Sequence, residues 1–341
     1  MVSKVHFYSL MAEQAAKQIT GSFQQWTSFL STASRLYKYP YPDQLMIHIQ
    51  RPDATACAEY ELWSDTMGRY VKRGAKGSAL LDCRGEQPRL RYVFDVSDTG
   101  ARENSRPVIL WEMREEYRRP VQDALERAFG ASGEKSLESQ LEEAASRLAE
   151  DYWQNYGRQF LHILADSYLE EYDEDNLSVV FQRAVAASAA YQACARCTEE
   201  ADEYFVQTDF LDVLDFNTRQ TANALGTAVN GVSRQIFREI ETAIRSYERS
   251  KALERSQNDE RNQLYHEREL SDSRHPAGGD GKEGAGQVRQ NAADISGGTK
   301  PHAVQRLGAD GEAVPPSLGD SGHGGAAAEA VRPQPSGGQA S

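Results

Sequence analysis

One segment of this chain, residues 218–250, has an apolar residue at almost every third or fourth position. The residues of this stripe are Leu225, Val229, Val232, Ile236, Ile240, Ile244 and Tyr247. Such spacing places them on one face of an α-helix, and Asn217 stands where an N-cap is expected. The pattern predicts a long helix whose apolar face packs against other helices. A partner surface is the alternative if the stripe is wider than its own domain can cover.

The residues around this stripe, 134–255, are predicted to form an all-helical domain. Ser136 is a suitable N-cap for a helical stretch over Leu137–Tyr172 that is interrupted near Asp151. Its buried side is predicted to comprise Phe160, Leu161, Leu164 and Tyr168. An Ala-rich helix is predicted over Val179–Cys197, and the acidic run 170–175 between the two is predicted to be a solvated loop.

Residues 5–130 show mixed α and β patterns. Three helices are predicted, over Trp26–Tyr37, from Pro42 to the residue before Pro52, and over Ala58–Met67. Alternating segments then predict a small antiparallel sheet, closed by residues 108–111, before a helix that ends at Gly130. The strands of this sheet are predicted at 69–73, 78–83 and 90–96, with turns at 74–77 and 85–88.

The last 71 residues, 271–341, have a different composition. They contain no Phe, Tyr or Trp, but 15 of the 26 Gly and 6 of the 12 Pro. Such a segment buries too little apolar surface to offset its ordering entropy. The sequence therefore predicts an α+β N-terminal domain with a small antiparallel sheet, an all-α helical domain, and a disordered C-terminal tail or linker.

The charge is unevenly distributed along the chain. In total 38 Lys and Arg stand against 51 Asp and Glu, a formal net charge of −13. Residues 1–119 have 17 basic and 14 acidic residues, a net of +3, whereas residues 120–250 have 11 and 24, a net of −13. A uniformly basic nucleic-acid binder is therefore excluded, but a basic front domain is not.

Neither a membrane span nor a secretory leader is predicted. No run of 18 apolar residues occurs, and the first residues are not followed by the apolar region of a signal peptide. Four Cys in a chain of this length do not indicate a disulfide framework, which suits a reducing compartment. A cytoplasmic protein without a membrane partner is expected.

Three segments begin like enzyme or metal-binding motifs, but each lacks a residue that the motif requires. Lys76 precedes Gly77, whereas a Walker A loop needs Lys directly after its second Gly. His266 begins a zincin-like motif, but Leu270 stands where the second zinc ligand would be. The CxxC of Cys194 and Cys197 has no second ligand pair and fits one side of a helix. We therefore expect no catalytic site, no metal and no cofactor.

The positive signal is the basic segment, defined here as residues 69–91. It has seven basic residues against two acidic ones, a net of +5. Single-stranded nucleic acid is bound by cations that follow the phosphates and by aromatic rings that stack on bases. The predicted binding residues are Arg69, Lys72, Arg73, Lys76, Arg89, Arg91, Tyr37, Tyr39, Tyr70 and Tyr92. An ordinary solvated strand face over an aromatic core explains the same composition.

Several motifs in the front domain resemble the N-terminal domain of ArdC-type antirestriction proteins. The most specific are Gly68-Arg-Tyr-Val-Lys-Arg-Gly-Ala-Lys-Gly77 and Phe94-Asp-Val-Ser-Asp-Thr99, supported by Trp26-Thr-Ser-Phe-Leu30, Tyr37-Lys-Tyr-Pro40, Gln44-Leu45 and Trp63. The resemblance covers about residues 20–130 and implies single-stranded DNA binding. The metallopeptidase half that usually follows in that family, with its paired His, is missing here.

The order of basic domain, acidic helical domain and Gly-rich tail also resembles the front end of large helicase and DNA-methylase polyproteins of bacterial conjugative elements. This likeness implies a non-enzymatic single-stranded DNA-binding module of a mobile genetic element, acting in DNA transfer or antirestriction. A helicase or methylase of the same element is a possible partner. The alternative function is that of an acidic interaction protein, which docks a helicase or mimics DNA through residues 134–255.

Overall fold

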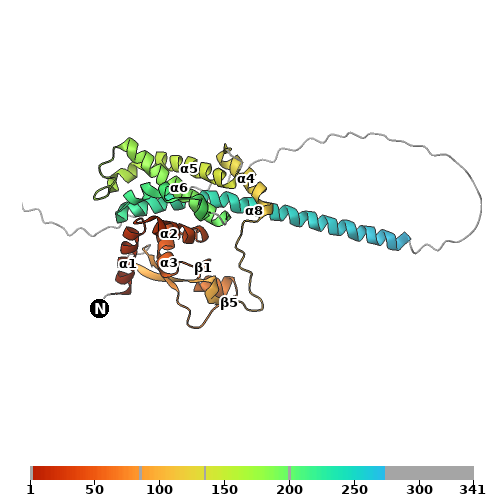
Figure 1. The fold of residues 1–341 in the computed structure, drawn as a ribbon. Coiled ribbons are helices and arrows are strands. Elements are labelled where there is room, and N and C mark those ends of the chain that lie inside the picture. Colours follow the sequence, from red (N-terminus) through yellow and green to blue (C-terminus); the bar gives the residue numbers. More distant parts are fainter. Residues whose placement is uncertain (1–2, 84–86, 134–135, 199–200, 273–341) are drawn as a thin grey trace, which may run out of the picture. The chain divides into compact units, whose positions relative to one another are not determined.

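The structure is a computed structural model and describes residues 3–83, 87–133, 136–198 and 201–272. These residues lie within one compact unit, mostly helical, with a small antiparallel sheet in its N-terminal part (Figure 1). The predicted fold class, an α+β front part followed by helices, is confirmed over this range. The predicted tail, residues 271–341, lies outside the described residues except for its first two.

The long helix predicted from the apolar stripe is α8, which spans Arg219–Asp272. Its N-cap is Thr218 rather than Asn217, since Thr218 and Thr221 each accept the other's backbone N–H at 3.2 Å. The Asn217 side chain instead accepts the N–H of Tyr168 at 3.0 Å. The helix also continues past the predicted end at residue 250, and residues 252–267 are all exposed.

Three helices and α8 form the helical part of the core. They are α4 (Glu115–Phe129), α5 (Leu137–Phe160) and α6 (Glu174–Cys197), and each contacts α8. The stripe residues from Leu225 to Ile244 are buried, which confirms that the stripe faces the core. Short helical segments complete this part: η3 (Leu161–Ile163), α7 (Ala201–Tyr204) and η4 (Gln207–Asp215).

Three details of the helical predictions differ from the structure. The helix α5 continues through Asp151, whose exposed side chain stays solvated and does not interrupt the helix, and it ends at Phe160. Tyr168, predicted to be buried, is 67% exposed. The acidic run 170–175 is only partly a loop, since Asp173 caps α6 by accepting the N–H of Asn176 at 2.8 Å.

The front part begins with three helices, α1 (Lys4–Gln18), α2 (Phe23–Arg35) and α3 (Tyr41–Gln50). The first was not predicted, because its apolar residues form no strong stripe. The second begins after Ser22, whose side chain accepts the N–H of Gln25. Pro42 lies in the first turn of α3, as the sequence predicts, where its missing N–H removes no helical hydrogen bond.

Two small antiparallel sheets follow. The first has the order β1-β4-β3, with β1 (Cys57–Glu59), β4 (Arg89–Asp95) in the centre and β3 (Ser78–Asp82). The second pairs β2 (Tyr70–Val71) with β5 (Thr99–Gly100), which follows the short helix η2 (Val96–Asp98). At the open side of β3, the side-chain amide of Gln50 bonds both the N–H and the C=O of Ala79 at 2.9 Å.

The sheet differs from the prediction in three ways. Residues 69–73 and 78–83 do not form a hairpin, because β2 pairs with β5 and β3 pairs with β4. Residues 108–111, in a part of the chain that the structure describes, are not a strand. The predicted helix 58–67 is a strand at its start, followed by a short helix around η1 (Leu62–Thr66).

One buried cluster contains residues from both predicted folded domains, 5–130 and 134–255. The indole N–H of Trp26 in α2 donates to Ser188 in α6 at 2.8 Å, and both side chains are fully buried. The amide of Gln44 in α3 donates to Asn230 in α8 at 3.0 Å. The division into two domains remains a prediction, and in the structure the two ranges share their apolar core.

Close packing joins α3 to α8 across this shared core. A Cβ atom added to Gly226 would lie 2.1 Å from the buried ring of Tyr41, whereas one added to Gly231 would lie 3.4 Å from Tyr152. We expect Gly226→Ala to lower the free energy of unfolding by about 1 to 3 kcal/mol through overpacking. Gly231→Ala on the same helix should raise it by up to about 1 kcal/mol, as helix propensity predicts. Urea unfolding of both variants tests this, and equal effects would contradict the packing.

Candidate nucleic-acid interface

Three predicted cations lie together on the segment that joins β2 to β3. Lys72, Arg73 and Lys76 are all exposed. The chain turns between them, with the N–H of Ala75 bonded to the C=O of Lys72 at 3.1 Å and Gly74 at a φ of +85°. This positive φ favours glycine at position 74. We call Lys72, Arg73 and Lys76 the cationic loop.

Two exposed tyrosines flank the cationic loop. Tyr70 on β2 is 44% exposed and Tyr92 on β4 is 41% exposed. Gly77, next to Lys76, lies against the ring of Phe94, where an added Cβ would be 3.0 Å away. Phe94 and Tyr92 are two residues apart on β4 and therefore share a face of the sheet. Both ends of the loop thus lead to an accessible aromatic ring.

A further cation, Arg102, joins this surface. Its guanidinium lies over the ring of Tyr70 at 5.9 Å, and Gly100 provides the space that this ring fills, since a Cβ there would be 2.3 Å from it. Sequence reasoning missed Arg102 because its proximity to Tyr70 arises from the pairing of β2 with β5, which no local pattern indicates.

The Nζ of Lys72 in the cationic loop also donates to the C=O of Ser97 at 2.9 Å, and the three other predicted cations contact the scaffold. Arg91 forms an ion pair with Asp43 on α3 and a second with Glu59 at 3.1 Å, and its side chain is only 24% exposed. Arg69 donates to the hydroxyl of Thr99 at 2.8 Å. The Nε of Arg89 lies 3.4 Å from the carboxylate of Asp82, although the Arg89 side chain is exposed. Of these three, Arg89 is the most accessible to a ligand.

Of the remaining predicted rings, Tyr37 is buried and Tyr39 is half-buried. Tyr37 is 6% exposed, packs 4.7 Å from the ring of Phe237, and donates to Glu241 at 2.7 Å. The hydroxyl of Tyr39 donates to the C=O of Cys57 at 2.8 Å. Burial raises the pKa of both phenols. The structure therefore does not bring these two rings to the surface of Tyr70 and Tyr92.

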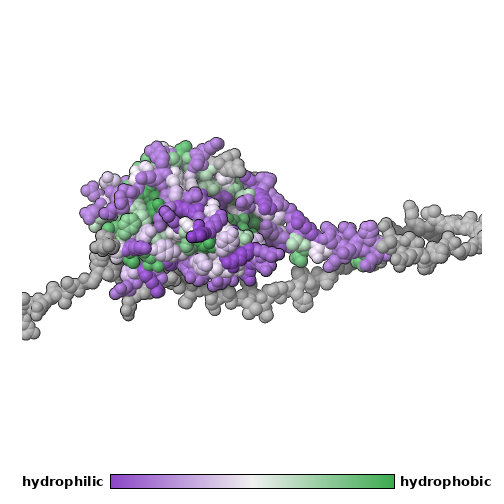
Figure 2. All heavy atoms as spheres, turned by 90° about the horizontal axis from the view of Figure 1, so that it is seen from below, coloured by the Kyte–Doolittle hydropathy of each residue, from purple (hydrophilic) through white to green (hydrophobic). Residues whose placement is uncertain are grey.

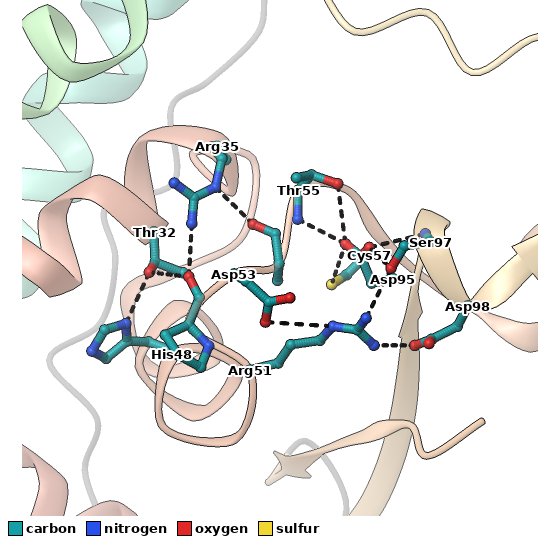
Figure 3. A network of polar contacts seen from close by, with 12 residues as sticks. Thr32, Arg35, His48, Arg51, Asp53, Thr55, Cys57, Asp95, Ser97 and Asp98 are labelled. Atoms are coloured by element: carbon teal, nitrogen blue, oxygen red, sulfur yellow. Dashed lines mark hydrogen bonds and ion pairs between the residues drawn. The ribbon is translucent and has the colours of Figure 1, made fainter. Parts of the chain in front are cut away.

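Asp95 connects the segments beneath this surface (Figure 3). It is buried, and one carboxylate oxygen accepts the N–H groups of Thr55 at 2.7 Å and Ala56 at 2.9 Å. The other accepts the N–H of Ser97 at 3.0 Å and its hydroxyl at 2.7 Å. Burial alone would raise the pKa of Asp95, but these hydrogen bonds hold it below its usual value.

The same network reaches β5 and α3. Arg51, at the end of α3, donates to the hydroxyl of Ser97 at 2.8 Å and is ion-paired with Asp98. The hydroxyl of Thr99 donates to the C=O of Val96 at 2.8 Å while it accepts from Arg69. The polar residues of the 94–99 motif thus hold the strand that supports Tyr70.

A separate groove of about 490 Å³ lies between α1, α2 and α3. Its lining residues are Met11, Gln14, Ala15, Gln18, Ile19, Gln24, Gln25, Ser28, His48 and Ile49. His48 does not add a charge at neutral pH, because burial and the neighbouring Arg35 lower its pKa to about 4. This lining offers no cation to a phosphate, so the groove is distinct from the cationic loop in its chemistry.

Neither a metal site nor a reactive cysteine pair is found in the described ranges. Among those residues, no group of three or more His, Cys, Asp or Glu is placed to hold a metal ion. Cys194 and Cys197 are buried on α6, and burial raises the pKa of Cys197 to about 12, which keeps it a thiol. No helix within the described part of the chain is long and apolar enough to cross a membrane.

Comparison with known proteins gives no relatives: the chain matches no protein-family model, no curated protein and no solved structure. The resemblance to ArdC-type domains therefore rests on the motif residues alone.

The role of Asp95 can be tested directly. In Asp95→Asn an NH₂ group replaces one carboxylate oxygen, so the two donors that this oxygen accepted from would be left without an acceptor. We therefore expect the free energy of unfolding to fall by about 3 kcal/mol. Asp53→Asn is the matched control, because it makes the same charge change at a residue 79% exposed, 3.8 Å from Arg51. The control substitution should lower the free energy of unfolding by less than about 1 kcal/mol. Equal effects in thermal unfolding would contradict a structural role for Asp95.

Proposed function

We propose that this protein is a non-enzymatic, sequence-tolerant single-stranded DNA-binding module. The observation that carries the proposal is the exposed cationic loop, with accessible rings at Tyr70 and Tyr92 on either side. Cations on an irregular loop can follow a flexible phosphate backbone, and each base that stacks on a ring adds about 1 to 3 kcal/mol. In a duplex the bases stay stacked on each other, so they cannot stack on the tyrosine rings and this contribution to binding is lost.

The likeness of the 68–77 and 94–99 motifs to ArdC-type domains supports the biological setting of this proposal. We place the protein in the cytoplasm, as part of a mobile genetic element, where it binds DNA during transfer or protects incoming DNA from restriction. The acidic surface of the helical part would keep non-specific binding to duplex DNA low, because like charges repel phosphate.

The test is a titration of the full chain against labelled single and double strands over a range of salt concentrations. Each phosphate contact adds about −0.7 to the log-log salt slope for single strands. Lys72→Ala, Arg73→Ala and Lys76→Ala together should therefore make the slope shallower by about 2. Tyr70→Ala with Tyr92→Ala should weaken binding at all salt concentrations, since stacking releases few counterions.

The matched control removes three exposed cations from α4 and α5: Arg119→Ala, Arg127→Ala and Arg158→Ala. This control should leave the salt slope and the affinity unchanged. The proposal fails if wild-type protein does not bind single strands, or if the loop variant and the control behave alike. In that case the alternative function, that of an acidic interaction protein, becomes the better explanation. Three apolar side chains of α8 support it, each at least 60% exposed: Leu253, Leu264 and Tyr265.

A further inference from the structure

The solvent-facing side of α8 has a row of arginines within the most acidic part of the sequence. Arg234, Arg238, Arg245 and Arg249 are all exposed. Their spacings of 4, 7 and 4 residues place them within about 60° of one another around the helix, since each residue advances by about 100°. At about 1.5 Å per residue, the row is about 22 Å long. We call these four residues the arginine row.

The acidic residues next to the arginine row are held by other contacts. The side chain of Glu241 is 15% exposed and accepts hydrogen bonds from Tyr37 at 2.7 Å and Lys38 at 3.0 Å. Glu248 accepts from the hydroxyl of Tyr117 at 2.9 Å. Arg245 pairs with Glu241, whereas Arg234, Arg238 and Arg249 form no ion pair with any of the described residues. A net positive strip therefore faces solvent.

The front part of the chain adds to this strip. Lys38, between α2 and α3, has a side chain 65% exposed and meets α8 at Glu241. Arg196 of α6 is only partly exposed, because its guanidinium stacks over Trp111 at 4.4 Å and donates to the C=O of Trp111 at 3.1 Å. The exposed cations at this junction thus come from both the α+β part and the helical part.

We propose that the arginine row is a second contact for the phosphate backbone of single-stranded DNA. The charges are spread along about 22 Å rather than converging on one point, which suits a polymer of phosphates better than a single phosphate group. Arginine also binds phosphate oxygens in a bidentate manner and is more weakly hydrated than lysine. This inference rests on the proposed function, and it adds a longer DNA path than the cationic loop alone provides.

The experiment compares two lengths of single-stranded DNA, about 8 and about 30 nucleotides, on the full chain. The test variant has Arg234→Gln, Arg238→Gln, Arg245→Gln and Arg249→Gln, and all four side chains are exposed, so its thermal unfolding should match wild type. The salt slope for the long strand should become shallower by about 3, since four contacts of about 0.7 each are lost. Binding of the short strand, which the cationic loop accommodates, should not change.

The matched control removes four other exposed arginines, with Arg119→Gln, Arg127→Gln, Arg158→Gln and Arg183→Gln. The inference is overturned if the control lowers the slope as much as the test variant, or if the long strand is bound equally by test variant and wild type. If the long strand is bound equally by the test variant and wild type, but the cationic-loop variant loses binding, the proposed function stands. The arginine row would then be assigned to contact with an acidic protein surface. Failure of wild type to bind either length would overturn both proposals.

Discussion

Burial of the apolar stripe of α8 is the constraint on which the other elements depend. The helices α4, α5 and α6 contact α8, and from the front part Tyr37 packs against Phe237 and Tyr41 against Gly226 of the same helix. The sheets have only a small cluster of their own around Leu80 and Val93, which packs on α3. The position of the cationic loop thus follows, through α3, from the packing on α8.

The features that the sequence predicts well are those set by local periodicity. The α8 stripe and the apolar face of α2 repeat every three or four residues, and both are buried in the structure. Pairing between distant segments has no such signal. Residues 69–73 alternate as a strand would, but their partner at Thr99 lies beyond two other strands. Likewise, nothing near Tyr37 indicates that Phe237, 200 residues later, covers its ring.

The summed charge of a segment likewise does not show where its charged side chains lie on the surface. The spacing of Arg234, Arg238, Arg245 and Arg249 is visible in the sequence, yet a sum over residues 120–250 gives −13 and conceals it. Glu241 and Glu248 accept hydrogen bonds from Tyr37, Lys38 and Tyr117, and within the described residues Arg245 is the one arginine of the row that pairs with either carboxylate. A net charge of −13 is therefore compatible with a local row of exposed arginines. Hydrophilic residues cover much of the face drawn in Figure 2.

The contact between Gln50 and Ala79 has a consequence for the behaviour of the protein in a crowded solution. An open strand edge presents free N–H and C=O groups, which can pair with a strand of another molecule and begin aggregation. The Gln50 amide supplies one donor and one acceptor in the position that a neighbouring strand would occupy. This side chain thus occupies the backbone groups of Ala79 and removes one donor and one acceptor from the open edge of β3, where a strand of another molecule would need them.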